Sequence, residues 1–235
     1  GASLAAMDYN LGADFKATET EGRSTIYSLF ATYPLIRQRQ HNLSVTANYD
    51  HKDLYNESNR VTTSNKQTDA ATLGLNGDVF DSIFGGGYTS LGVNFVMGRL
   101  DLGRWKDDLD SDQSSAKTHG GYKKAILNLY RMQRLAEKTS LSLSLTHQFA
   151  FKNLDSSEDF SLGGAYGVRA YPSNEASGDE GTLLAVELQQ RLTQNISVFG
   201  FYDYGHIKTN HTEWTSTSIP NSYHLEGIGG GVAYI

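Results

Sequence analysis

A strict two-residue alternation of apolar and polar side chains is the feature of this sequence that most restricts its fold. Between residues 140 and 151 the chain reads SLSLSLTHQFAF, which places mainly leucine and phenylalanine on one face and serine, threonine and glutamine on the other. Helical faces repeat near 3.6 residues, so no helix separates the residues in this way. The segment has about 11–12 residues, the length that a tilted strand needs to cross a bilayer. It therefore predicts a β-strand long enough to span a membrane.

The same alternation recurs along the whole chain and predicts an all-β fold. No run approaches the roughly 18–20 consecutive apolar residues of a membrane helix, which excludes a transmembrane helix. Barrel strands alternate apolar and polar residues, so a mean hydropathy of -0.45 remains compatible with a membrane barrel. The ten predicted strands lie at residues 7–15, 24–33, 43–50, 68–78, 90–97, 122–134, 140–151, 184–189, 196–206 and 224–235.

The connections between these strands separate a membrane barrel from a soluble sandwich, which could also alternate. From the second strand onward they are short and long in turn, as in outer-membrane barrels with periplasmic turns and extracellular loops. The short ones lie near residues 37–42, 79–86, 135–139 and 193–195, and the long ones near 54–67, 103–120, 153–181 and 207–223. Only the first connection, near residues 19–23, is short where a long one is due. The pattern predicts a transmembrane antiparallel outer-membrane β-barrel.

Composition excludes several classes of function. A formal net charge of -6 provides no basic surface for nucleic acid. The chain has no cysteine, which rules out a disulfide scaffold and a Cys-based zinc site. No phosphate-binding loop motif is present, so we expect no nucleotide partner. No signal peptide is visible at the start, and since a barrel protein needs one, we expect the start of the gene product to precede this sequence.

Neither a metal site, a cofactor nor an enzymatic site is predicted. The seven His residues form no metal-binding motif, and no nucleophile elbow or clear Ser–His–Asp order occurs. Barrel proteases and phospholipases exist, so an enzyme remains a minor alternative. The acidic groups could hold calcium, but we interpret them as solvated loop residues. They are Asp107, Asp108, Asp110 and Asp112 in one loop, and Glu175, Asp179 and Glu180 in another.

The longest connection, residues 153–181, carries the strongest indication of function. Loops of this length without secondary structure are usually functional or disordered. Glycines at 163, 164 and 167 allow close backbone approach. Arg169 is followed by Ala170, Tyr171 and Pro172 in an apolar and aromatic setting. This setting predicts a folded-in loop whose guanidinium points at a partner.

The segments SSEDFSLGG, VRAYP and GDEG in this loop resemble the C-terminal barrel of two-partner secretion transporters (TpsB; haemolysin activator and secretion proteins). That family shares a superfamily with the barrel-assembly protein BamA, in which a long loop with a V-R-G-[FY] motif folds into the lumen. Here the motif is Val168, Arg169, Ala170 and Tyr171, with Ala170 in place of the commoner glycine. The family's F-x-D-x-G motif matches Phe201, Asp203 and Gly205. The resemblance implies that Arg169 pairs with Asp203 inside the barrel.

Strand alternation supports this pairing independently of the resemblance. Asp203 shares a face with Phe199 and Phe201, and an acid on the lipid face would be costly, so Asp203 should point into the lumen. A planar guanidinium suits a bidentate contact with its carboxylate. Removing one partner would cost about 3–5 kcal/mol in a dry lumen. In a water-filled lumen the cost would fall to about 1 kcal/mol.

The resemblance implies that residues 1–235 are one partial barrel domain, with about ten strands of a sixteen-strand family barrel. Placed on the family, these are strands five to fourteen, so the periplasmic POTRA domains and the first and last barrel strands would be absent. The implied location is the bacterial outer membrane, with lipid around the barrel. The implied function is secretion of a partner exoprotein, haemolysin-like or adhesin-like, through a polar lumen. We expect that lumen to include Asn10, Thr46, Asn94, Gln148 and Glu187.

Two other functions are compatible with the sequence. One is a BamA-like insertase that assembles other outer-membrane proteins, which the number of upstream POTRA domains would distinguish. The other is an unrelated porin or barrel enzyme, which single-channel conductance and hydrolase assays would distinguish.

Overall fold

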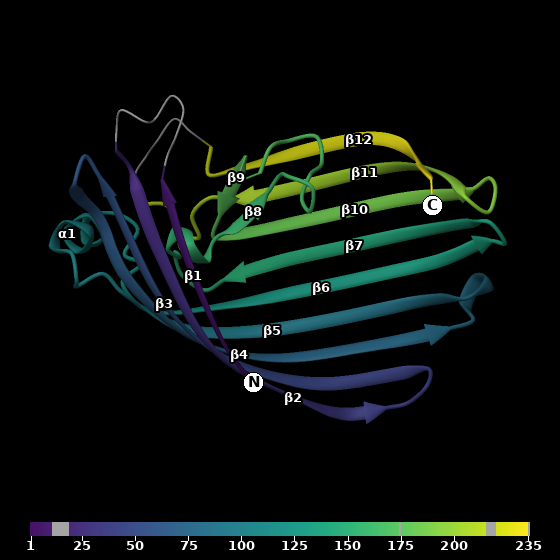
Figure 1. The fold of residues 1–235 in the computed structure, drawn as a ribbon, viewed down its shortest axis with the longest axis horizontal. Helices are drawn as coiled ribbons and strands as arrows, with labels where there is room; N and C mark the ends of the chain where they lie inside the picture. The colour runs from purple at the N-terminus through teal and green to yellow at the C-terminus, as the bar shows by residue number, and fades with distance from the viewer. Residues whose placement is uncertain (11–18, 174, 215–219, 235) are drawn as a thin grey trace.

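The computed structural model describes residues 1–10, 19–173, 175–214 and 220–234. Ten long strands form one antiparallel sheet, in which each strand pairs with the next (Figure 1). Their order is β1-β2-β3-β4-β5-β6-β7-β10-β11-β12. The bounds are β1 (Ala2–Asn10), β2 (Glu21–Arg37), β3 (His41–Ser58), β4 (Val61–Asp81), β5 (Gly87–Asp101), β6 (Gly120–Ala136), β7 (Thr139–Ala150), β10 (Glu180–Arg191), β11 (Ile196–Lys208) and β12 (Ser222–Tyr234). The predicted all-β, antiparallel architecture is confirmed.

The remaining elements are short and lie in the connections. They are η2 (Ile83–Gly85), α1 (Lys106–Ser114), η3 (Ser156–Glu158), β8 (Phe160–Leu162) and β9 (Ala176–Gly178). β8 and β9 pair with each other in a separate two-stranded sheet. Among the described residues, no helix has both the length and the apolar character needed to cross a membrane.

The curved sheet has an apolar convex face. The register places Leu73 opposite Phe95 and Leu75 opposite Val93, and all four side chains are exposed. Leu145 continues this face, opposite Leu129 on one side and Leu184 on the other. An apolar surface of this extent is not stable in water, and lipid is the solvent that suits it. Along each strand, the apolar residues of the alternation therefore face the lipid, and the residues between them face the lumen.

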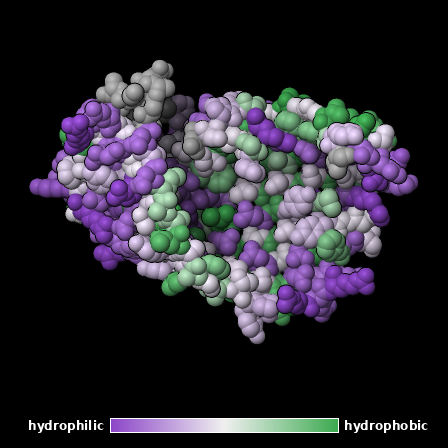
Figure 2. Space-filling view, in the orientation of Figure 1, coloured by the Kyte–Doolittle hydropathy of each residue, from purple (hydrophilic) through white to green (hydrophobic). Residues whose placement is uncertain are grey.

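The concave face is more polar, and its buried residues form two clusters. One cluster consists of Ala70, Val96, Tyr122, Ala150 and Leu154. The other consists of Leu162, Val168, Ala176, Ile207 and Leu225. Leu154, Leu162, Val168 and Ala176 belong to the segment between β7 and β10, so this segment packs inside the curve of the sheet. Figure 2 shows the hollowed side, with hydrophilic residues gathered over the end that carries α1.

Short turns lie at one end of the sheet, and the long connections, including the one with α1, lie at the other end, as predicted (Figure 1). The prediction of a long loop at 54–67 is wrong, because β3 continues to Ser58 and β4 begins at Val61. Asn59 and Arg60 form the turn with φ of 52° and 63°, a left-handed pair typical of tight hairpins. The segment is polar on both faces, which is typical of a loop. It is nevertheless a hairpin, because strands that extend beyond the lipid need no apolar face.

The first strand also differs from the prediction. β1 ends at Asn10 in the structure, and residues 11–15 of the predicted strand lie outside the described residues. Tyr9 faces the concave side, since its hydroxyl donates to Asn56 Oδ1 (3.0 Å). Asn10 is therefore on the convex side, and its assignment to the lumen is wrong. Residues 21–23 of the expected short connection belong to β2.

Thr46, Asn94, Gln148 and Glu187 do face the concave side. The register aligns Thr46 with Gly74 and Gly74 with Asn94, and it continues through Ile126 to Gln148. Glu187 lies opposite Phe201, on the same face as Asp203.

Candidate functional site

The connection between β7 and β10 is a folded loop rather than a free one. The β8–β9 ladder closes it, and Gly163 and Gly164, with φ of 91° and 80°, turn the chain directly after β8. The Gly164 amide donates to the Tyr171 carbonyl oxygen (2.8 Å), and the Tyr171 amide donates to Val168 (3.1 Å). These bonds form a compact turn that presents residues 168–171 to the wall of the sheet.

Val168 packs the turn against β11. Val168 and Leu162 are fully buried beside Ile207, and Tyr171 packs against the same cluster. Gly205 of β11 leaves the space that they occupy. A Cβ atom at Gly205 would lie 2.6 Å from Leu162 Cδ1 and 2.9 Å from Val168 Cγ2. The glycine of the strand motif therefore allows the apolar residues of the loop to contact the wall.

Arg169 meets two carboxylates of the wall. Its Nε and Nη2 donate to Asp203 Oδ2 and Oδ1, both at 2.8 Å, in a bidentate contact. Its backbone amide also donates to Asp203 Oδ2 (3.1 Å), and its Nη1 donates to Glu187 Oε2 (2.6 Å). The Asp203 side chain is 0% exposed, whereas those of Arg169 and Glu187 are 27% and 32% exposed. Asp203 thus depends on Arg169 for its counter-charge far more than Glu187 does.

The ring of Phe201 stacks on the guanidinium. The Arg169 Cζ atom lies 3.5 Å from the centroid of the Phe201 ring, in a cation–π contact. The ring itself lies over Gly229 of β12, where an added Cβ would be 2.6 Å from Phe201 Cζ. All three residues of the strand motif therefore act on the loop motif: Asp203 by charge, Phe201 by its ring and Gly205 by the space it leaves.

Ala170 replaces the glycine that the resembling family commonly has. Its φ is not positive, so a Cβ atom is not strained there. The methyl group faces Gly227 of β12, where an added Cβ would lie 3.1 Å from the Ala170 Cβ. The departure from the family pattern is therefore compatible with the same loop conformation.

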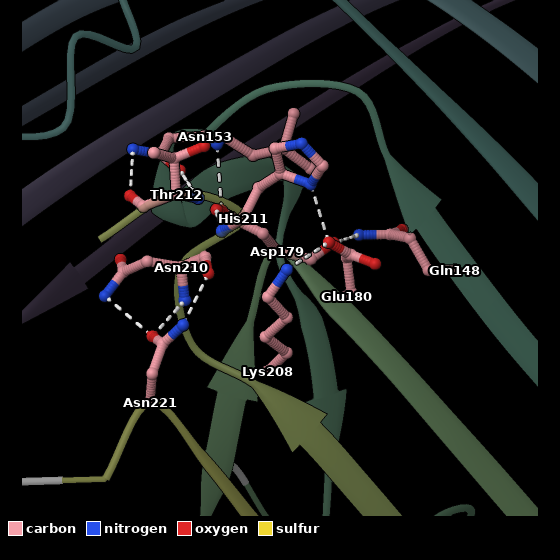
Figure 3. A network of polar contacts seen from close by, with 10 residues as sticks. Gln148, Asn153, Asp179, Glu180, Lys208, Asn210, His211, Thr212 and Asn221 are labelled. Atoms are coloured by element: carbon pink, nitrogen blue, oxygen red, sulfur yellow. Dashed lines mark hydrogen bonds and ion pairs between the residues drawn. The ribbon is translucent and has the colours of Figure 1, made fainter. Parts of the chain in front are cut away.

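A second polar network joins both ends of the loop to the β11–β12 connection (Figure 3). Asp179 accepts from the backbone amides of Leu154 (2.8 Å) and His211 (2.6 Å). Asn153 donates to the Thr212 carbonyl oxygen (2.9 Å) and accepts from the Thr212 amide (2.7 Å). Burial of the Asp179 carboxyl raises its pKa, although these two amides oppose the shift. The interpretation of Asp179 as a solvated acid is wrong.

Asp112 is a second acid for which the prediction of a solvated loop residue is wrong. Its carboxylate is buried and accepts from Thr118 N (2.6 Å), Thr118 Oγ1 (2.7 Å) and His119 N (3.0 Å). It thereby closes the connection that contains α1. Within the described ranges, no group of three or more His, Cys, Asp or Glu side chains has an arrangement that could hold a metal ion.

The contact of Glu187 with Arg169 is not among the predictions from the sequence, although Glu187 is predicted on the lumen face. Glu187 and Asp203 are acids on neighbouring strands with the same inward orientation. A single basic loop residue that reaches one of them is within reach of the other.

An antiparallel sheet with a lipid-facing convex side and a loop folded against its concave side defines the class, an outer-membrane β-barrel with a lumen-facing loop. A family model described as "Haemolysin secretion/activation protein ShlB/FhaC/HecB" matches residues 2–234. The chain belongs to this family and is therefore an outer-membrane protein of the β-barrel type.

Individual relatives agree with this assignment. The heme/hemopexin transporter protein HuxB of Haemophilus influenzae strain 86-028NP is 28% identical over 244 residues, which cover 97% of this chain and 41% of the relative. The HuxB of strain KW20 / Rd is 27% identical over 233 residues. The chain thus spans about two fifths of the length of the curated relatives it matches.

Two solved structures have the same fold. CdiB from Escherichia coli superposes with a TM-score of 0.78 at 19% identity, over 98% of this chain and 43% of that chain. CdiB from Acinetobacter baumannii superposes with a TM-score of 0.71 at 20% identity, over 100% of this chain and 40% of that chain.

Proposed function

We propose that this chain forms part of the wall and the lumen loop of an outer-membrane transporter that exports a partner exoprotein by two-partner secretion. In this proposal the ten strands belong to a larger closed barrel that is preceded by POTRA domains, and the loop between β7 and β10 occupies the lumen until an exported chain passes. The observation that carries the proposal is the contact of Arg169 with the buried Asp203, made by a loop that packs on the lumen face of a family member.

The chemistry of the concave face supports passage of an extended polypeptide. Hydrogen-bonding groups lie along the wall at Thr46, Asn94 and Glu187, which face the concave side. The loop is held by charged and polar contacts as well as by packing. Such contacts can be exchanged for water when the loop moves, at a cost set by their burial.

The cargo is proposed only as a class, a secreted partner protein of the haemolysin or adhesin type. A haem-related partner is a second candidate, which the name of the relatives, heme/hemopexin transporter, favours. Secretion assays with candidate exoproteins encoded beside the transporter gene would distinguish the two.

The test is export of the partner by the complete transporter carrying Arg169→Ala. We expect export to fall strongly while the barrel still folds and reaches the outer membrane. Arg60→Ala is the matched control, because the Arg60 side chain is 84% exposed at the tip of the β3–β4 hairpin. Export at the wild-type level by a correctly folded Arg169→Ala protein would refute the role given to this residue.

The barrel-assembly alternative makes a different prediction. If the protein inserted other barrels, its depletion would lower the amounts of unrelated outer-membrane proteins. The two-partner secretion proposal expects those proteins to stay constant while one exoprotein fails to reach the medium.

A further inference from the structure

Two acids at the start of the loop project in one direction. Asp155 immediately precedes the single turn of η3 and Glu158 is its last residue, and residues three apart lie on one face of a 3-10 helix. Asp155 also begins the turn by accepting from Ser157 N (3.0 Å) and Ser157 Oγ (2.6 Å). The local sequence thus fixes the direction in which both carboxylates point.

Three lysines from three different strands meet these acids. Lys52 of β3 and Lys124 of β6 bind the two oxygens of Glu158, with Nζ to Oε1 at 2.7 Å and Nζ to Oε2 at 3.0 Å. Lys66 of β4 binds both oxygens of Asp155, at 2.7 and 2.9 Å. On its own strand, each of the three lysines occupies a position that faces the lumen side of the sheet. They bind the loop from β3, β4 and β6, whereas Arg169 binds carboxylates of β10 and β11.

Burial makes these ion pairs consequential. Glu158 and Lys124 are buried at 5% and 8% exposure. Burial alone would raise the pKa of Glu158, but the adjacent Lys124 and Lys52 hold it below its usual range. Lys66 and Ser157 lower the pKa of Asp155 in the same way, against the effect of its burial. Removing one partner of such a pair leaves the other charge without compensation in a site that water reaches poorly.

Backbone contacts connect this cluster to the far end of the loop. Lys124 Nζ donates to the Glu158 carbonyl oxygen (2.8 Å). Gln148 Nε2 donates to the carbonyl oxygens of Glu158 (3.1 Å) and Asp179 (3.0 Å). One side chain of β7 therefore joins the segment that leaves β7 to the segment that enters β10. The base of the loop, residues 153–162 and 176–179, is held together as one unit.

We propose that Asp155 and Glu158, with Lys52, Lys66 and Lys124, form a second ionic anchor that positions the base of the loop independently of Arg169. This inference rests on the proposed function, because it concerns how the same loop is held in the lumen. During passage of an exported chain the anchored base stays on the wall, and residues 163–173, which carry Arg169, move away from β10–β12. The turn at Gly163 and Gly164, directly after β8, is the point about which they move.

The experiment uses the complete transporter in its membrane, with a reporter for the docked loop. Cysteines at Ala170 and Gly227 would place their Cβ atoms about 3.1 Å apart, close to the separation that a disulfide spans. This region of the protein has no natural cysteine. The disulfide yield therefore reports how often residues 163–173 are docked, which depends on a fixed base, and ion conductance in planar bilayers reports whether the lumen is open.

The anchor is tested by charge reversal and exchange. Lys124→Glu and Glu158→Lys should each lower the disulfide yield by about tenfold and raise the conductance, because each sets like charges together in a poorly hydrated site. The double variant, which exchanges the two charges, should restore part of both signals, because the pair between positions 124 and 158 forms again while Lys52 then faces a like charge. Lys123→Glu is the matched control, since Lys123 is the exposed neighbour on the convex face, and it should leave both signals unchanged.

Two outcomes would overturn the inference. One is a docked fraction in both single variants that equals wild type. The other is an exchange variant that stays as open as the single ones. If the reversals prevent folding, the neutral variants Lys124→Met and Glu158→Gln replace them, and their effect should add to that of Arg169→Ala. Neither readout needs an exported partner, so a failure of the secretion proposal would leave this test standing.

Discussion

Asp203→Asn is the substitution whose effect can be worked out most directly from the contacts. Asparagine has nearly the shape of aspartate, so no cavity forms, but the residue loses its charge and one of its two acceptor oxygens. Asp203 accepts from Arg169 Nε and Nη2, each at 2.8 Å. Each such bond to a charged group contributes about 1.5–3 kcal/mol. One amide oxygen can retain one of them, while the amide nitrogen would face a guanidinium donor.

The expected loss is about 2–3 kcal/mol, after allowing for the lower cost of burying a neutral amide. It corresponds to a rise of roughly 30- to 160-fold in the ratio of undocked to docked loop. Glu187→Gln is the internal comparison. Glu187 makes one bond to Arg169 and its side chain is 32% exposed, so water replaces much of the interaction and the loss should stay below about 1 kcal/mol.

The assay is the disulfide yield of the Ala170→Cys, Gly227→Cys pair, measured together with the open probability of single channels. Asp203→Asn should lower the yield and raise the open probability far more than Glu187→Gln does. The reasoning would be refuted if Glu187→Gln had the larger effect. It would also be refuted if Asp203→Asn left both signals at the wild-type level.

Three further predictions use the same readouts. Gly205→Ala should destabilise the docked loop by about 1–3 kcal/mol, because the added methyl group meets Leu162 and Val168. Gly121→Ala is the control, since its surroundings are open, and equal effects of the two variants would contradict the packing argument. Burial raises the pKa of Asp159 to about 7, so its contribution to holding the base of the loop, on which docking of residues 163–173 depends, is complete below about pH 4 and is lost as the pH rises to about 7. Asp159→Asn should remove that part of the pH dependence, and an unchanged pH profile would disprove it. Ala170→Gly is measured by the open probability alone, because position 170 is then not available to the cysteine pair. It should raise the undocked fraction only a few-fold, through about 0.4–1 kcal/mol of added backbone freedom, and a channel that is always open would show that the methyl group has a larger role.

Much of the wall could be predicted from the sequence, because one physical rule governs it. A strand between lipid and a polar lumen must alternate, and segments such as residues 140–151 follow that rule. Where the strands leave the lipid, the rule no longer applies. Residues 54–67 are polar on both faces and were read as a loop, yet they continue β3 and β4.

The site was predictable where motifs of this sequence resemble a known family and where strand alternation shows which way a side chain points. Asp203 could be placed on the lumen face by alternation, and the loop motif supplied a basic partner. The lysines at 52, 66 and 124 could not be paired with Asp155 and Glu158 in this way. They come from three strands, and only the folded loop brings its acids to them. Asp179 was misread for the same reason, since its two amide donors are 25 and 32 residues away.

The β3–β4 hairpin has a consequence for how a cell presents this protein to its surroundings. β4 has 21 residues, about 70 Å at 3.4 Å per residue, whereas a strand tilted by about 45° needs only 9–11 residues to cross the hydrocarbon. The excess forms a stiff, ladder-bonded projection that ends at Asn59 and Arg60. Antibodies and phage would reach this tip whether or not the lumen is occupied. A peptide epitope inserted between these two residues would therefore label living cells without disturbing the loop that fills the barrel.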